Sequence, residues 1–158
     1  MDNNPFAVLT LVAAPAILTN AMSVLALGSG NRAGRVMDRF REIMKELKAL
    51  EPGSEVHAMK LRQLDRLQQR ARYLNTAMKA FFTALGSFAA TTVVAIVGGA
   101  FAEAASRTAV RVSGAVALSV GAFAVGNLVF GCVLLVRDSR LAIANLTEDA
   151  DLIRSQQR

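Results

Sequence analysis

Residues 80–102 have the sequence AFFTALGSFAATTVVAIVGGAFA, which contains no Asp, Glu, Lys, Arg or His. The 23 uncharged residues between Lys79 and Glu103 would extend about 35 Å as an α-helix, and the hydrocarbon core of a bilayer is about 30 Å thick. A core helix of a soluble protein rarely needs an apolar stretch of more than about 14 residues. Because backbone polar groups in lipid must pair within their own segment, this stretch predicts a transmembrane helix.

Two further stretches have the same character. No charged residue or histidine occurs between Asp2 and Arg32 or between Arg111 and Arg137, which leaves gaps of 29 and 25 residues. The predicted spans are about 5–28, 80–102 and 112–136. The first basic residue comes too late for a cleavable signal peptide, so we expect the first segment to be retained. The sequence therefore predicts an all-α membrane protein with three transmembrane helices, in which residues 1–158 form a single membrane domain.

The charged segment 32–79 has heptad spacing on both sides of Pro52-Gly53, a dipeptide that breaks a helix. The apolar positions are Val36, Phe40, Ile43, Leu47 and Leu50 before the break, and Leu64, Leu67, Ala71, Leu74 and Met78 after it. This pattern predicts an antiparallel helical hairpin with a coiled-coil seam, each arm continuous with a membrane helix. We expect the tail 137–158 to begin as a helical extension of the third span and to lie against the hairpin.

The distribution of charge predicts the orientation in the membrane. Residues 32–79 hold 12 Lys and Arg against 6 Asp and Glu, which equals the net charge of +6 of the whole chain. Cytoplasmic loops carry such a basic excess, so we expect a cytoplasmic hairpin and carboxyl terminus and an amino terminus outside. Nucleic acid is not an expected partner, because no aromatic platform or reader motif accompanies the charge.

The residue types that carry catalysis or bind cofactors are scarce. The only cysteine, Cys132, lies in the third apolar stretch, and the only histidine, His57, has no His or Cys neighbour. No ionisable residue other than this cysteine lies within a predicted span, whereas catalysis at a membrane usually needs a histidine, an acidic pair or a metal cluster. We therefore expect no enzyme, no catalytic residue, no cofactor and no metal.

A basic run follows the first span. It consists of Arg32, Arg35, Arg39 and Arg41. One interpretation is an anchor for anionic lipid headgroups, worth about 1 kcal/mol per residue near the surface. The other is a ring of arginines at the mouth of a pore. The first is favoured, with the lipid bilayer as the partner.

Polar residues within the spans allow two interpretations as well. Asparagines in lipid should face protein or water, so they either bond across helices or line a polar path. The candidates are Thr19, Asn20, Ser23, Asn31 and Asn127, with Val24 and Leu27 as a hydrophobic constriction and Pro15, Gly28, Gly30 and Gly34 as a kink and flexible joint. Thr19, Asn20 and Ser23 lie on the predicted first helix, which would line the path in an oligomer.

Small residues in the second and third spans favour self-association. They recur at a spacing of four, which lets helix backbones approach closely. The pairs are Gly86 and Ala90, Ala95 and Gly99, Ala117 and Gly121, and Ala122 and Gly126. Three helices offer more such faces than one subunit can use, so we expect a homo-oligomer.

Several short motifs occur along the layout of this chain: the run Pro15 to Leu18, Asn31-Arg32, Arg35-Val36, Asp38-Arg39, Arg70, Arg72 and Arg140-Leu141-Ala142. With these residues the chain resembles the bacterial membrane-protein family catalogued as domain of unknown function 2721. The resemblance implies three spans in a bacterial inner membrane and implies no activity.

Two functions remain after these observations. The first is a homo-oligomeric ion channel or small-solute transport protein. The alternative is a membrane-anchored scaffold or regulatory protein whose hairpin binds a partner, for which Met37, Met44 and Leu61 are the apolar candidates outside the seam. The sequence favours the channel slightly.

Overall fold

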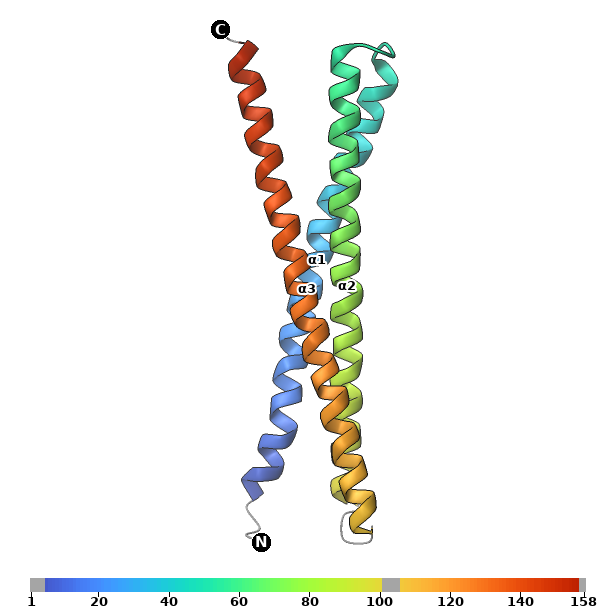
Figure 1. Cartoon of the computed structure of the whole chain (residues 1–158), viewed down its shortest axis with the longest axis vertical. Helices are drawn as coiled ribbons and strands as arrows, with labels where there is room; N and C mark the ends of the chain where they lie inside the picture. Colours follow the sequence, from blue (N-terminus) through green and yellow to red (C-terminus); the bar gives the residue numbers. More distant parts are fainter. Residues whose placement is uncertain (1–4, 101–105, 157–158) are drawn as a thin grey trace. The chain divides into compact units, whose positions relative to one another are not determined.

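The computed structural model describes residues 5–100 and 106–156, and the side-chain surroundings of residues 13, 16–98 and 106–144. These residues form three α-helices and no strand (Figure 1). The helices are α1 (Pro5–Ala49), α2 (Glu55–Ala100) and α3 (Arg107–Gln156). The prediction of an all-α fold with three long helices is confirmed. The end of the second predicted span, at residues 101–102, lies outside the described residues.

Each helix contributes to two compact units. Unit 1 consists of Met1–Leu27 and Lys79–Phe130, and unit 2 consists of Gly28–Met78 and Gly131–Arg158. The apolar stretches of the sequence fall mostly in unit 1, and the charged segment falls in unit 2. The expectation of a single membrane domain stays a prediction.

Unit 1 exposes much of its apolar surface. α2 and α3 each contain a stretch that is long and apolar enough to cross a membrane, and only 22% and 17% of these stretches are buried. Phe81, Ala84 and Phe88 form buried positions of α2, whereas Leu118 and Phe123 of α3 are exposed. The core helix of a soluble protein would be mostly buried, so this surface is typical of helices that face lipid.

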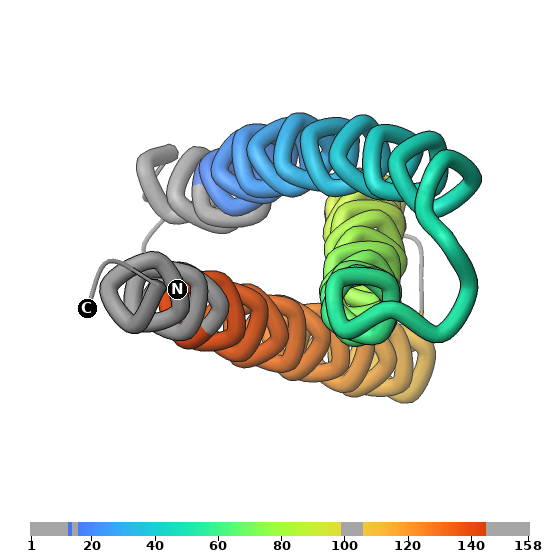
Figure 2. The backbone as a smooth tube through the Cα atoms, turned by 90° about the horizontal axis from the view of Figure 1, so that it is seen from above, coloured from blue at the N-terminus to red at the C-terminus, as the bar shows by residue number. Residues whose placement is uncertain are grey.

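Unit 2 contains the turn between α1 and α2, which is visible from above in Figure 2. Gly53 has a φ of +89°, a conformation that is readily available only to glycine. The Ser54 hydroxyl accepts a hydrogen bond from the His57 backbone N–H at 3.2 Å, which caps the start of α2. Pro52-Gly53 therefore separates the two helices as the sequence predicts.

The two charged arms that meet at this turn pack through the apolar positions of their heptads. Val36 and Ile43 of α1 and Leu67 and Leu74 of α2 are buried in one cluster. Partly buried residues packed against them are Ala33, Phe40, Leu47, Leu64, Ala71 and Leu135. Lys60 Nζ of α2 lies 2.6 Å from Glu46 Oε2 of α1, and its hydrogen bond holds the pKa of Glu46 below the ordinary value. Apolar packing and an ion pair thus join the arms, which run in opposite directions (Figure 1).

The glycines of the predicted joint lie inside an unbroken helix. α1 is helical through Gly28, Gly30 and Gly34, and a Cβ added at Gly28 or Gly34 would meet no heavy atom from elsewhere in the described chain within 4 Å. The backbone of Pro15 also lies within α1, and its side chain lies outside those described. The kink and the flexible joint stay predictions.

Candidate functional site

Three of the four arginines of the basic run gather on one side of α1. Arg32, Arg35 and Arg39 are three and four residues apart, so they share a helix face, and all three line one pocket. Arg41 does not line this pocket, and its guanidinium lies 3.6 Å from Asp38 in an exposed ion pair. The structure therefore separates Arg41 from the other three arginines of the basic run.

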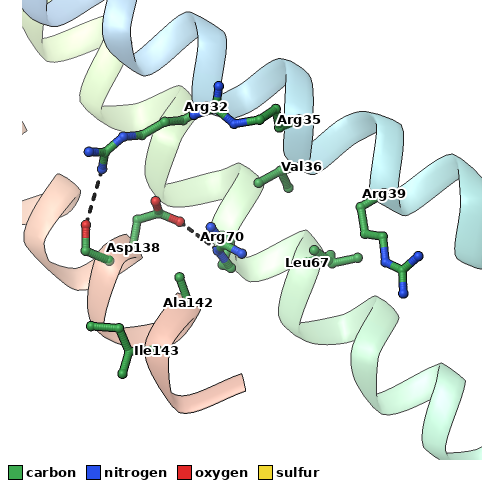
Figure 3. Close-up of a pocket in the computed structure, with 10 residues that line it drawn as sticks. Arg32, Arg35, Val36, Arg39, Leu67, Arg70, Asp138, Ala142 and Ile143 are labelled. Atoms are coloured by element: carbon green, nitrogen blue, oxygen red, sulfur yellow. Dashed lines mark hydrogen bonds and ion pairs between the residues drawn. The ribbon is translucent and has the colours of Figure 1, made fainter. Parts of the chain in front are cut away.

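The other helices supply an ion pair to the same pocket. Arg70 of α2 donates a hydrogen bond from Nε to Asp138 Oδ1 of α3 at 2.9 Å. Asp138 is 1% exposed, so its carboxylate depends on this partner. Arg32 of α1 donates a hydrogen bond to Ser139 Oγ of α3 at 3.2 Å (Figure 3). All three helices of unit 2 are thus linked through polar side chains.

The pocket has a volume of about 480 Å³. Its polar lining is Arg32, Arg35, Arg39, Arg70, Asp138 and Ser139, and its apolar lining is Val36, Leu67, Ala142 and Ile143. Four arginines thus face one carboxylate, and that carboxylate is already paired with Arg70. The concentration of positive charge makes the pocket a candidate anion site.

Two of these arginines have no carboxylate partner among residues 16–98 and 106–144, whose side chains are described. Arg39 is paired with Glu42, whose Oε2 lies 2.5 Å away. No ion pair within those two ranges involves Arg32 or Arg35. Guanidinium groups present planar forks of N–H donors that match phosphate or carboxylate oxygens. Among the residues that the structure describes, no group of three His, Cys, Asp or Glu could hold a metal ion.

The polar residues predicted for a path are placed in two ways. Ser23 Oγ donates a hydrogen bond to the Thr19 carbonyl and Asn127 Nδ2 donates one to the Phe123 carbonyl, each at 3.0 Å and within its own helix. These bonds run along the helices rather than across them. Within unit 1, Asn20 is exposed on α1.

The two candidate constriction residues share that exposed face. Val24 is 63% exposed and Leu27 is 69% exposed, and they lie four and seven residues after Asn20. Asn31, in unit 2, is exposed as well. Whether this face lines a path stays a prediction.

Neither Arg70 nor Asp138 is among the site residues that the sequence predicts. They are 68 positions apart on different helices, so no periodicity relates them. One signal was present, because Asp138 is an acid at the end of an uncharged stretch with Arg137 and Arg140 close by in the sequence. An acid in that position is costly to bury without a partner, which is a reason to search for one.

Comparison with known proteins gave one match. A family model described as "Protein of unknown function (DUF2721)" matches residues 12–148. No curated protein and no solved structure is significantly similar to the chain. The matched range includes every residue that lines the pocket.

Proposed function

Since the chain belongs to the DUF2721 family, whose function is unknown, we propose a function from its own residues: a homo-oligomeric integral membrane protein that conducts ions or small solutes. The protein has three spans in a bacterial inner membrane, with the amino terminus outside. The hairpin 32–79 and the carboxyl-terminal tail are cytoplasmic. The first helix lines the conducting path, and other copies of the chain complete it.

The exposed apolar surface of unit 1 supports insertion in a membrane. Leu118, Phe123 and Val93 are among the large apolar side chains that the folded chain leaves exposed. A soluble monomer rarely exposes an apolar surface of this extent. The uncharged stretch before Arg32 is long enough for α1 to cross the membrane as well, which brings the number of spans to three.

The exposed amide of Asn20 is the observation that carries the conducting path. This residue lies near the middle of the proposed first span, and its side chain is exposed in the single chain. An amide that faced lipid there would be unsatisfied and costly. A second copy of the chain or a column of water satisfies it, and the adjacent Val24 and Leu27 then narrow the same path.

Flux through reconstituted liposomes tests this proposal. Val24→Ser or Leu27→Ser should raise ion flux, because a polar side chain wets a hydrophobic constriction. Leu118→Ser is the matched control, since Leu118 is exposed on α3, a different helix from the one proposed to line the path. The proposal fails if both variants match the wild type and the wild type conducts nothing under voltage or pH steps.

A scaffold is the second candidate, and one observation favours it. Met37, Met44 and Leu61 are exposed in unit 2, outside the packed seam. Methionine side chains are flexible and common on surfaces that bind partner helices. If the protein shows no flux in the experiment above, it is a membrane-anchored regulator that binds a partner through this face.

A further inference from the structure

We propose that the arginine pocket of unit 2 binds the phosphate group of an organic anion. The site is separate from the proposed solute path, since every residue that lines it belongs to unit 2. The inference therefore does not depend on conduction.

The charges of the pocket select an anion. Arg32 and Arg35 line it without a carboxylate partner among the described side chains of residues 16–98 and 106–144, and Arg32 is held toward α3 by its bond to Ser139. An anion between these two groups gains charge-assisted hydrogen bonds, which are about twice as strong as neutral ones. Phosphate fits better than a halide, because its oxygens can accept from several guanidinium forks together.

Arg70 can take part although it is already paired. A guanidinium has five N–H donors, and Asp138 accepts from the one on Nε. The donors on the two terminal nitrogens remain for a ligand. Asp138, nearly fully buried, therefore acts as a positioning residue that holds Arg70 at the wall of the pocket (Figure 3).

The size and apolar wall of the pocket indicate that the phosphate carries an organic group. A water molecule occupies about 30 Å³ in the liquid, so about 480 Å³ far exceeds the needs of a bare anion. Val36 and Leu67 lie on one side of the lining, and Ala142 and Ile143 come from α3. These side chains offer apolar contact to the remainder of the ligand.

Phospholipid headgroups and soluble phosphorylated molecules share this chemistry. Arg32 is the first charged residue after a 29-residue uncharged stretch, and Asp138 is the second after a 25-residue stretch. If these stretches span a bilayer, the pocket lies where lipid phosphates are, and basic pockets between membrane helices on the cytoplasmic side bind such headgroups. The experiment therefore needs one arm for each source.

The test measures the thermal stability of the full chain in maltoside detergent micelles, which contain no phosphate, at constant ionic strength. One arm adds adenosine monophosphate as a soluble probe, and the other adds phosphatidylglycerol to the micelles. A ligand that binds only the folded state raises the melting temperature with its concentration. We expect a rise in at least one arm. A rise with the nucleotide assigns a soluble ligand, and a rise with phosphatidylglycerol alone assigns a lipid.

Variants separate binding in the pocket from general attraction to charge. The double variant Arg32→Gln and Arg35→Gln should weaken binding by about tenfold or more, because two charged donors are lost. The control, Arg41→Gln with Lys45→Gln, removes the same charge from exposed positions of α1 outside the pocket. Its affinity should stay within about twofold of the wild type, since exposed charges contribute little.

A conservative variant keeps the test decisive if the double variant does not fold. Arg35→Lys retains the charge and removes the planar fork, so affinity should fall several-fold with the unliganded melting temperature unchanged. The proposal is overturned if neither arm stabilises the wild type, if the control loses as much affinity as the double variant, or if Arg35→Lys binds like the wild type.

Discussion

Asp138 is an acidic residue that is almost completely buried in unit 2. The residue is 1% exposed, and Arg70 is its ion-pair partner among the described side chains. A buried carboxylate without a hydrogen-bonded cation would be severely destabilising. The pair also connects α2 to α3, so the same contact determines both the packing of the tail helix and the shape of the pocket.

Replacing this carboxylate tests how much it contributes to the stability of the folded chain. Asp138→Asn should lower the free energy of unfolding by about 2–3 kcal/mol, because the guanidinium of Arg70 then has no negatively charged partner. Chemical unfolding in mild detergent, followed by circular dichroism, measures the change. Asp38→Asn is the control, since Asp38 forms an exposed pair with Arg41 and should cost less than about 1 kcal/mol. Equal losses in the two variants would contradict the role of Asp138.

The helices themselves were predictable because their signals are local. Charge-free length and heptad spacing predicted three helices, and Val36, Ile43, Leu67 and Leu74 of the two predicted seams are buried in one cluster. Helix periodicity identifies which face is apolar, so it identifies the residues that pack. The meeting of Arg70 with Asp138 was not predictable, since a contact between distant segments leaves no periodic pattern.

The predicted joint at the end of the predicted first span concerns the flexibility of a helix rather than its presence. Gly28, Gly30 and Gly34 weaken a helix by roughly 1 kcal/mol each in the interior, and this predicted a flexible joint within a continuous helix. The structure has α1 helical throughout this segment. The packing of Val36 and the helical residues before and after the segment stabilise the helix there, although the glycines disfavour it.

The ion pair between the arms of unit 2 predicts a dependence of stability on pH. The hydrogen bond from Lys60 lowers the pKa of Glu46 in the folded state, so folding favours its ionised form. The stabilisation is therefore complete above the unfolded pKa and is lost as pH falls through the folded one. Between about pH 6 and pH 3, Glu46→Gln should lose less stability than the wild type.

Unfolding curves at several pH values, recorded in one detergent, provide this comparison. Glu42→Gln serves as the control, because Glu42 pairs with Arg39 within α1 and does not join the two arms. A wild type and a Glu46→Gln variant with parallel pH profiles would refute the contribution of the pair between the arms.

At the scale of the whole molecule, self-association depends on helix surfaces that pack against no other part of the described chain. Gly121 and Gly126 of α3 lie in predicted small-residue pairs, and a Cβ added at either would meet no heavy atom from elsewhere in the described chain within 4 Å. Their small faces therefore do not serve close packing within unit 1. Self-association through these faces stays a prediction from the sequence.

Gly126→Leu tests that self-association. A leucine there has space in the protomer and is favoured over glycine in a helix by roughly 0.5–1 kcal/mol, so the protomer should not lose stability. At an interface between copies, the same side chain would separate backbones that must approach closely. We therefore expect the variant to disperse the assembly in mild detergent, as measured by light scattering after size-exclusion chromatography. Gly114→Leu, at another open helical glycine of α3 whose neighbours four residues away are Val110 and Leu118, should leave the assembly intact. A wild type that is monomeric at native-like lipid content, or a Gly126→Leu variant that stays assembled, would show that this face of α3 is turned to lipid instead.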